Sequence, residues 1–224
     1  MDAAIESVRV KLAELGRVIF ERRLTDTAGG NLSARVGDLV CITPRYAGSK
    51  YNWQLRPEQV LVTDLDGNKL EGDGDISREA KAHMALYKAF PDGNSVFHVH
   101  AQNVLVFCAA CQPIYPVLES TLKFGEVKVC EYAPAHSPQL AENIVAVVRG
   151  QEARIKTQAA AVIAPWHGLF VLGKDIEAAY DAAERIELNA RCILQGQALR
   201  QPGGPDVFEQ PRQALAAAVA QYKK

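Results

Sequence analysis

Three of the five histidines in the chain stand at positions that allow them to share one metal ion. His98 and His100 are two residues apart near the end of an apolar stretch, and side chains at this spacing point to the same face of a β-strand. His167 follows a second apolar stretch and precedes Gly168. Three imidazoles at strand ends are typical of a catalytic zinc ion that keeps one position open. The alternative is a set of structural histidines that bind no metal.

Three other residues with titratable side chains lie close to the predicted strands and helices. Glu79 falls in the first turn of a helix predicted just before the strand of His98. The helix dipole favours a carboxylate there, which explains this residue without any catalytic role. His83 lies four residues further on the same helix face, and we expect it to pack or pair locally. His136 precedes a predicted helix start, and we expect it on the surface.

Hydrophobic periodicity predicts the elements that must position these residues. We expect helices over 4–23, 78–90 with Ser77 as N-cap, 102 onward, 138–148 with Ser137 as N-cap, 175–199 and 210–222. We expect strands over 31–35, 39–43, 60–63, 95–99, 126–131, 159–164 and 169–172, and a loop over 44–58. The hairpin-like pairs predict an α/β (α+β-like) fold with a central, mostly antiparallel or mixed sheet flanked by helices. We expect one catalytic domain over 1–200, and a linker with a helical tail over 201–224.

Composition narrows the class of protein. The chain is 48% hydrophobic and 23% charged with a formal net charge of −1, which disfavours nucleic acid or an anionic membrane as the main partner. No apolar run approaches the roughly 18 residues that span a bilayer, and the first residues do not resemble a secretory signal. Five scattered cysteines, including the Cys108–Cys111 pair, predict reduced thiols that pack in a cytoplasmic protein.

Several short motifs occur together and in order along most of the chain. With them the sequence resembles the class II aldolase/adducin family, and is closest in pattern to the L-fuculose-1-phosphate aldolases. The matching segments are Gly29-Gly30-Asn31-Leu32-Ser33-Ala34-Arg35, Ile42-Thr43-Pro44, Asp64-Leu65-Asp66-Gly67, Ser77-Arg78-Glu79 with His83, Val96-Phe97-His98-Val99-His100, and His167-Gly168-Leu169 with Gly173-Lys174.

The resemblance implies a metal centre and a reaction. It implies that His98, His100 and His167 bind Zn²⁺, with Glu79 as a fourth ligand of the resting site that leaves when substrate chelates the metal and then acts as acid and base. The expected reaction is cleavage of a ketose 1-phosphate, or a close analogue, to dihydroxyacetone phosphate and an aldehyde through a metal-stabilised enediolate. Adducin-like relatives lose the histidines and are not enzymes.

The resemblance also implies a phosphate pocket, from which this sequence departs. Gly30, Asn31 and Ser77 match pocket positions. Arg45 and Arg78, however, stand where the aldolases usually carry a small hydroxyl residue. Because arginine suits phosphate and carboxylate through paired donors, we expect at least one of the two to bind the anionic end of the substrate. The alternative is that both point into solvent.

Other reactions stay open on the same scaffold. A sugar-phosphate dehydratase or a sugar-acid decarboxylase would use the same three histidines, and Glu119 with Lys123 loosely resembles the dehydratase pattern. A non-enzymatic, adducin-like interaction module is a more distant alternative.

The family resemblance and the tail predict a homo-oligomer, most simply a C4 tetramer. The tail carries too little apolar surface to be stable alone and must dock on something. In related aldolases a tyrosine of the C-terminal tail reaches the site of a neighbouring subunit, and Tyr222 is the only tyrosine in this tail.

Overall fold

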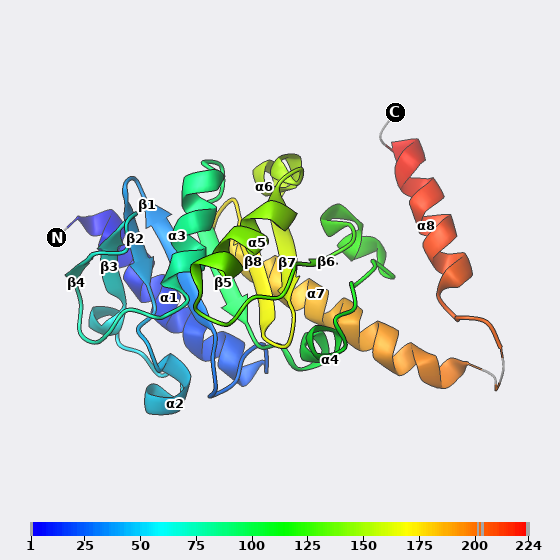
Figure 1. The fold of residues 1–224 in the computed structure, drawn as a ribbon, viewed down its shortest axis with the longest axis horizontal. Helices are drawn as coiled ribbons and strands as arrows, with labels where there is room; N and C mark the ends of the chain where they lie inside the picture. Colours follow the sequence, from blue (N-terminus) through cyan, green and yellow to red (C-terminus); the bar gives the residue numbers. More distant parts are fainter. Residues whose placement is uncertain (1, 201, 203, 223–224) are drawn as a thin grey trace.

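The structure, a computed structural model, describes residues 2–200, 202 and 204–222, without the side chains of residues 216 and 218–222. One eight-stranded sheet forms its centre (Figure 1). The strands are β1 (Asn31–Val36), β2 (Leu39–Ile42), β3 (Leu61–Asp64), β4 (Lys69–Glu71), β5 (Ser95–Val99), β6 (Lys128–Val129), β7 (Ala159–Ala164) and β8 (Gly168–Gly173). Their order is β4-β3-β2-β1-β5-β8-β7-β6, and every pair is antiparallel except β6–β7. The predicted mixed, mostly antiparallel sheet is therefore confirmed.

Helices cover both faces of the sheet and make a single α/β domain with two apolar cores. The helices α1 (Ala3–Glu21), α4 (Gln102–Ala110) and α7 (Ile176–Gly196) pack on one face. The helices α3 (Ala80–Ala89), α5 (Pro138–Val148) and α6 (Glu152–Thr157) pack on the other. Alternate residues of each strand point into one core or the other. The strands β5, β7 and β8 are therefore buried on both faces, and their sequences are continuous apolar runs.

Short elements complete the chain. They are α2 (Ala47–Tyr51), the 3₁₀ turns η1 (Pro57–Gln59), η2 (Glu119–Phe124) and η3 (Gln197–Leu199), and the last helix α8 (Glu209–Tyr222), which stands apart from the body in Figure 1. Among the described residues, no helix is long and apolar enough to cross a membrane.

Several predicted boundaries were wrong for local reasons. The helix expected from residue 78 begins at Ala80, because the carbonyl of Ser77 accepts from the amide of Ala80 in a separate turn that precedes it. Glu79 is therefore the N-cap rather than a first-turn residue. The segment 44–58 contains α2 and the start of η1. The strand expected over 126–131 is limited to β6, because only Lys128 and Val129 pair with β7 and Val127 forms an isolated bridge with Ile114. The helix α6 was not predicted, since six residues carry too little periodicity to show in the sequence.

Candidate metal centre and active site

A cavity of about 430 Å³ lies where β5 ends, between the loop after α1, the segment before α3, the loop before α5 and the β7–β8 turn. Its wall contains every residue predicted for the site except Tyr222, whose side chain is outside the described part of the chain. The predicted residues in the wall are Gly30, Asn31, Arg45, Ser77, Arg78, Glu79, His98, His100 and His167. Segments up to about 140 residues apart in the chain thus meet at one end of the sheet.

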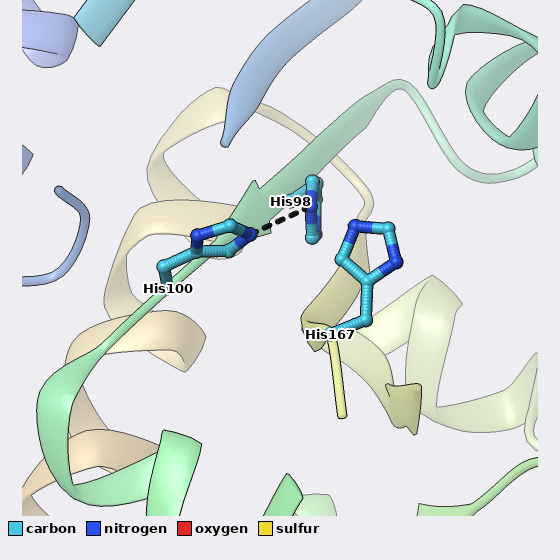
Figure 2. A group of neighbouring side chains, drawn as sticks. All are labelled: His98, His100 and His167. Carbon is cyan, nitrogen blue, oxygen red and sulfur yellow. Dashed lines mark hydrogen bonds between the residues drawn. The ribbon is translucent and has the colours of Figure 1, made fainter. Parts of the chain in front are cut away.

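Three histidines converge in this cavity (Figure 2). His98 belongs to β5, His100 follows that strand directly, and His167 ends the turn between β7 and β8. One ring nitrogen from each of them lies within 4.8 Å of the others. The His167 turn is held by hydrogen bonds from its own amide to the carbonyl of Ala164 and from the amide of Trp166 to the carbonyl of Cys108.

Hydrogen-bond partners set the tautomers of the two β5 histidines. The Nδ1 of His98 lies 3.2 Å from the carbonyl oxygen of Leu169, an acceptor, and so carries the proton. The Nδ1 of His100 lies 3.3 Å from a carboxylate oxygen of Asp26 and donates to it in the same way. Both side chains therefore present an unprotonated Nε2 to the cavity.

These two Nε2 atoms are separated by only 3.2 Å (dashed in Figure 2). Two lone pairs at this distance repel each other unless a cation lies between them. Two nitrogens bound tetrahedrally to zinc at about 2.0–2.1 Å would be about 3.3–3.4 Å apart, so the observed separation fits a shared metal ion.

Burial keeps the three imidazoles neutral, as ligands must be. It holds the pKa of His98 well below its usual value, with the neighbouring His100 and His167 acting in the same direction. Burial also lowers the pKa of His100, although the Asp26 carboxylate opposes the shift. The pKa of His167 falls to about 4, again mainly through burial. At neutral pH all three lone pairs are available for a divalent cation.

Glu79 places a carboxylate beside the histidines. Its side chain is only 6% exposed, and its Oε1 lies 3.4 Å from Nε2 of His167 and 2.5 Å from Nδ1 of His136. Burial raises the pKa of Glu79, and His136 and then Arg78 partly oppose that shift. A buried carboxylate with a raised pKa next to a metal site is well suited to exchange protons.

The residue pattern and the fold together match a known family. The model of the Class II Aldolase and Adducin N-terminal domain matches residues 10–194 of the chain. The chain belongs to this family. This match confirms the family that the motifs predicted. Members of the class II aldolase family are typically lyases that depend on a divalent metal.

Relatives within the class II aldolase/adducin family differ in the reaction that their names describe. The 3-oxo-tetronate 4-phosphate decarboxylase of Haemophilus influenzae is 32% identical over 200 residues, which cover 84% of this chain and 89% of that protein. An L-fuculose phosphate aldolase of Methanococcus maripaludis is 28% identical over 172 residues, covering 76% and 87%. The solved structure of an L-fuculose 1-phosphate aldolase aligns with a TM-score of 0.78 at 23% identity and covers 96% of both chains.

In this class II aldolase/adducin chain, small and polar residues line the cavity beside the metal centre. The backbone of Gly30 has a φ of +93°, and a Cβ there would lie 2.5 Å from the hydroxyl of Thr25, so only glycine fits. The side-chain Nδ2 of Asn31 donates to the hydroxyl of Ser77 at 2.9 Å, and that hydroxyl also accepts from the backbone amide of Glu79 at 3.3 Å. These bonds fix the polar groups that face the cavity.

Arg45 and Arg78, the two arginines that depart from the family pattern, both line the cavity. The guanidinium of Arg45 lies 4.5 Å from the ring centre of Tyr46, and its Nε is buried with no hydrogen-bond partner in the described part of the chain. Arg78 is exposed at the rim. The two side chains give this end of the cavity a positive charge.

Two further residues help to build the site and were not recognised from the sequence. Asp26 accepts hydrogen bonds from the backbone amides of Ala28 and Gly29 as well as from His100, and so ties the loop after α1 to this histidine. His136 was expected on the surface but lines the cavity and contacts Glu79, because the loop before α5 folds over the start of α3. The only signal in the sequence was that His136 lies next to a helix N-cap.

His83 and Glu119 lie outside the cavity wall. His83 is fully buried, and its Nδ1 lies 2.7 Å from the hydroxyl of Ser33, which contacts the hydroxyl of Tyr87 at 2.6 Å. His83 therefore packs inside the protein, but its hydrogen-bond partner belongs to β1, 50 residues away, and not to its own helix. Glu119 begins η2, is exposed and is not among the described residues that line the cavity.

Proposed function

We propose that this protein is a zinc-dependent lyase that breaks the bond between the carbons α and β to the carbonyl group of a phosphorylated sugar or sugar acid and releases dihydroxyacetone phosphate. The observation that carries the proposal is the meeting of three neutral imidazoles with the buried carboxylate of Glu79 in one cavity. An adducin-like interaction module has no need of such a set. All five cysteines are free thiols, which supports a cytoplasmic enzyme.

The chemistry follows from the charge that the reaction creates. When the bond between the carbons α and β to the carbonyl breaks, its electron pair moves through the α carbon onto the carbonyl oxygen and leaves an enediolate. A zinc ion held by His98, His100 and His167 would supply Lewis-acid stabilisation of that charge. Glu79 lies beside His167 and moves the protons. In the aldolase reaction it takes the proton that the β-hydroxyl loses as it becomes the aldehyde, and in either reaction it delivers a proton to the α carbon, which completes the ketone of the product.

The part of the cavity wall next to the histidines and Glu79 suits the anionic end of the substrate. Asn31 and Ser77 supply short polar groups, and Gly30 lets the backbone approach closely. Arg45 and Arg78 add positive charge and paired donors. We assign the phosphate to this wall, with the reacting carbons toward the histidines.

The first candidate reaction is an aldolase reaction on a ketose 1-phosphate, which gives dihydroxyacetone phosphate and an aldehyde. The second is decarboxylation of a 3-oxo sugar acid 4-phosphate. It yields the same enediolate with carbon dioxide as the leaving group, and therefore the same ketone. Two observations favour it, namely the 32% identical decarboxylase and the two arginines that stand where the aldolases usually carry a small hydroxyl residue. No feature of the cavity favours a dehydratase, since Glu119 does not line it.

The test begins with metal analysis of the purified protein. Zinc-loaded enzyme is then offered L-fuculose 1-phosphate and 3-oxo-tetronate 4-phosphate, and dihydroxyacetone phosphate is followed by its coupled reduction with NADH. We expect release from at least one of them, with carbon dioxide appearing only from the second. Absence of bound metal and of product from both would reject the proposed function.

Variants of Arg45 and Arg78 test substrate binding, with whichever of the two substrates reacts. Replacement of Arg45 or Arg78 by alanine should raise KM more than it lowers kcat, because the contact is made before and during the reaction alike. Lys81, an exposed lysine of α3 that does not line the cavity, is the control position. Equal kinetics in the Arg45, Arg78 and Lys81 variants would remove both arginines from substrate binding.

A further inference from the structure

The contact between Glu79 and His136 has no place in the reaction described above. Oε1 of Glu79 lies 2.5 Å from Nδ1 of His136, closer than the 3.4 Å that separate it from Nε2 of His167. The carboxylate therefore stands between two partners, one on the side of the metal ligands and one on the side of the α5 loop. Both partners line the same cavity.

The loop that carries His136 is anchored on both sides of this residue. The amide of Ser137 donates to the carbonyl of Pro134 at 3.1 Å, and the hydroxyl of Ser137 caps α5 by accepting from the amide of Leu140. His136 itself has a left-handed backbone with a φ of +69°. Since α5 packs against α3 in one apolar core, the helix that begins beside Glu79 and the loop that presents His136 are held in register.

A mobile carboxylate in this position needs a second partner. The side chain of Glu79 is 6% exposed, so water cannot solvate it when it gives up a metal ion. A buried carboxylate without a partner is costly, and without one Glu79 would stay on the metal and block the position that substrate must occupy. An imidazole nitrogen at 2.5 Å provides the alternative contact.

We propose that His136 is a positioning residue that holds the Glu79 carboxylate off the metal, and so keeps the acid/base group aimed at the substrate. This inference rests on the proposed function, because it concerns the same metal centre. It assigns a role to a residue that the sequence pattern did not single out.

The left-handed backbone of His136 limits which substitutions can test its role without backbone strain. His136→Gly tolerates a φ of +69° and removes the side chain without backbone strain. His136→Asn also tolerates this region and places an amide nitrogen near the position of Nδ1. The two variants therefore differ chiefly in the donor that faces Glu79.

The kinetic experiment compares both variants with the parent enzyme. We expect His136→Gly to lower kcat about tenfold to a hundredfold and to raise KM as well, because Glu79 then competes with the substrate for the metal and is misplaced for proton transfer. His136→Asn should recover most of the loss. In the Glu79→Gln background the same substitution should have little further effect, since the two residues act as a unit. Equal kcat in the parent and His136→Gly, or the same loss in both backgrounds, would overturn the proposal.

A second readout needs no substrate. Transfer of zinc from the loaded protein to a chromogenic chelator is expected to slow about tenfold in His136→Gly, because Glu79 then stays on the metal. His136→Asn should release zinc like the parent, and His136→Gly in the Glu79→Gln background should lose the effect. Equal release from all variants would reject the positioning role. If the protein binds no zinc, the proposed function itself fails, and the two failures are thereby distinguished.

Discussion

Glu79 is the single residue on which the proposed chemistry depends most. It is buried at the N-cap of α3, and its pKa is raised by that burial. We expect Glu79→Gln to keep the fold and much of the metal, since the amide has the same shape and the three imidazoles are unchanged. Turnover should fall by about 10²–10⁴-fold, the usual contribution of an acid/base group. Circular dichroism and metal content are the controls, and near-normal kcat would contradict the role.

At the scale of elements, the site depends on a loop that leaves room for an imidazole. A Cβ on Gly29 would lie 2.2 Å from Cε1 of His100, although the backbone there is not left-handed. Gly29→Ala must therefore push the ring from its place and from its Asp26 partner. We expect zinc affinity to fall about tenfold to a hundredfold, as when other supports of a metal ligand are lost.

A matched glycine separates this effect from backbone strain. Gly37 lies in the β1–β2 turn with a φ of +60°, and nothing lies within 4 Å of a Cβ built there. Gly37→Ala should cost about 1 kcal/mol of stability for the left-handed backbone and leave zinc affinity unchanged. Zinc titration of both variants checks the prediction, which fails if Gly29→Ala binds zinc like Gly37→Ala.

At the scale of the whole molecule, the buried histidines link stability to pH. Burial lowers the pKa of His167 to about 4 and that of His83 to about 3, whereas both titrate near 6.5 in the unfolded chain. The unfolded state therefore binds more protons below about pH 6.5. The free energy of unfolding of the metal-free protein should fall with decreasing pH, by up to about 1.4 kcal/mol per pH unit for each such histidine. The loss from His167 ends near pH 4, and that from His83 near pH 3.

Urea unfolding of metal-free protein at pH 7, 6 and 5 measures this slope. In His83→Gln the slope between pH 6 and 5 should be smaller by about one proton, because glutamine does not titrate. The comparison uses the slope, so a uniform loss of stability in the variant does not affect it. An unchanged slope would show that His83 is protonated in the folded protein.

Assembly is the second prediction at this scale. Helix α8 stands apart from the body in Figure 1, and its contact with the rest of the chain includes Arg212 over the ring of Tyr115 at 5.6 Å. We expect a homotetramer in which this tail completes a neighbouring site, with Tyr222 as the reaching side chain. Light scattering should give about four times the 24.4 kDa of one chain. A mass near one chain would exclude the oligomer, and full activity after truncation at Pro205 would exclude the catalytic part of the tail.

Local rules were sufficient to predict the histidine cluster and most of the sheet. The pairing of His98 with His100 follows from the two-residue period of a strand, and the apolar runs of β5, β7 and β8 show their burial directly. Such patterns depend only on neighbours along the chain. For the same reason they placed the ends of helices less well, as at Ser77 and Ala80, where one turn of hydrogen bonds decides the boundary.

Tertiary structure alone decided which partners surround the three histidines. Asp26 reaches His100 across 74 residues, and the α5 loop brings His136 to Glu79 across the packed faces of two helices. No period of two or 3.6 residues relates such positions, because the path of a loop is set by the core on which its flanking elements pack. The sequence by itself thus determined that the three histidines meet, and the sheet that carries them. The packing of α3 against α5 determined where Glu79 and His136 meet.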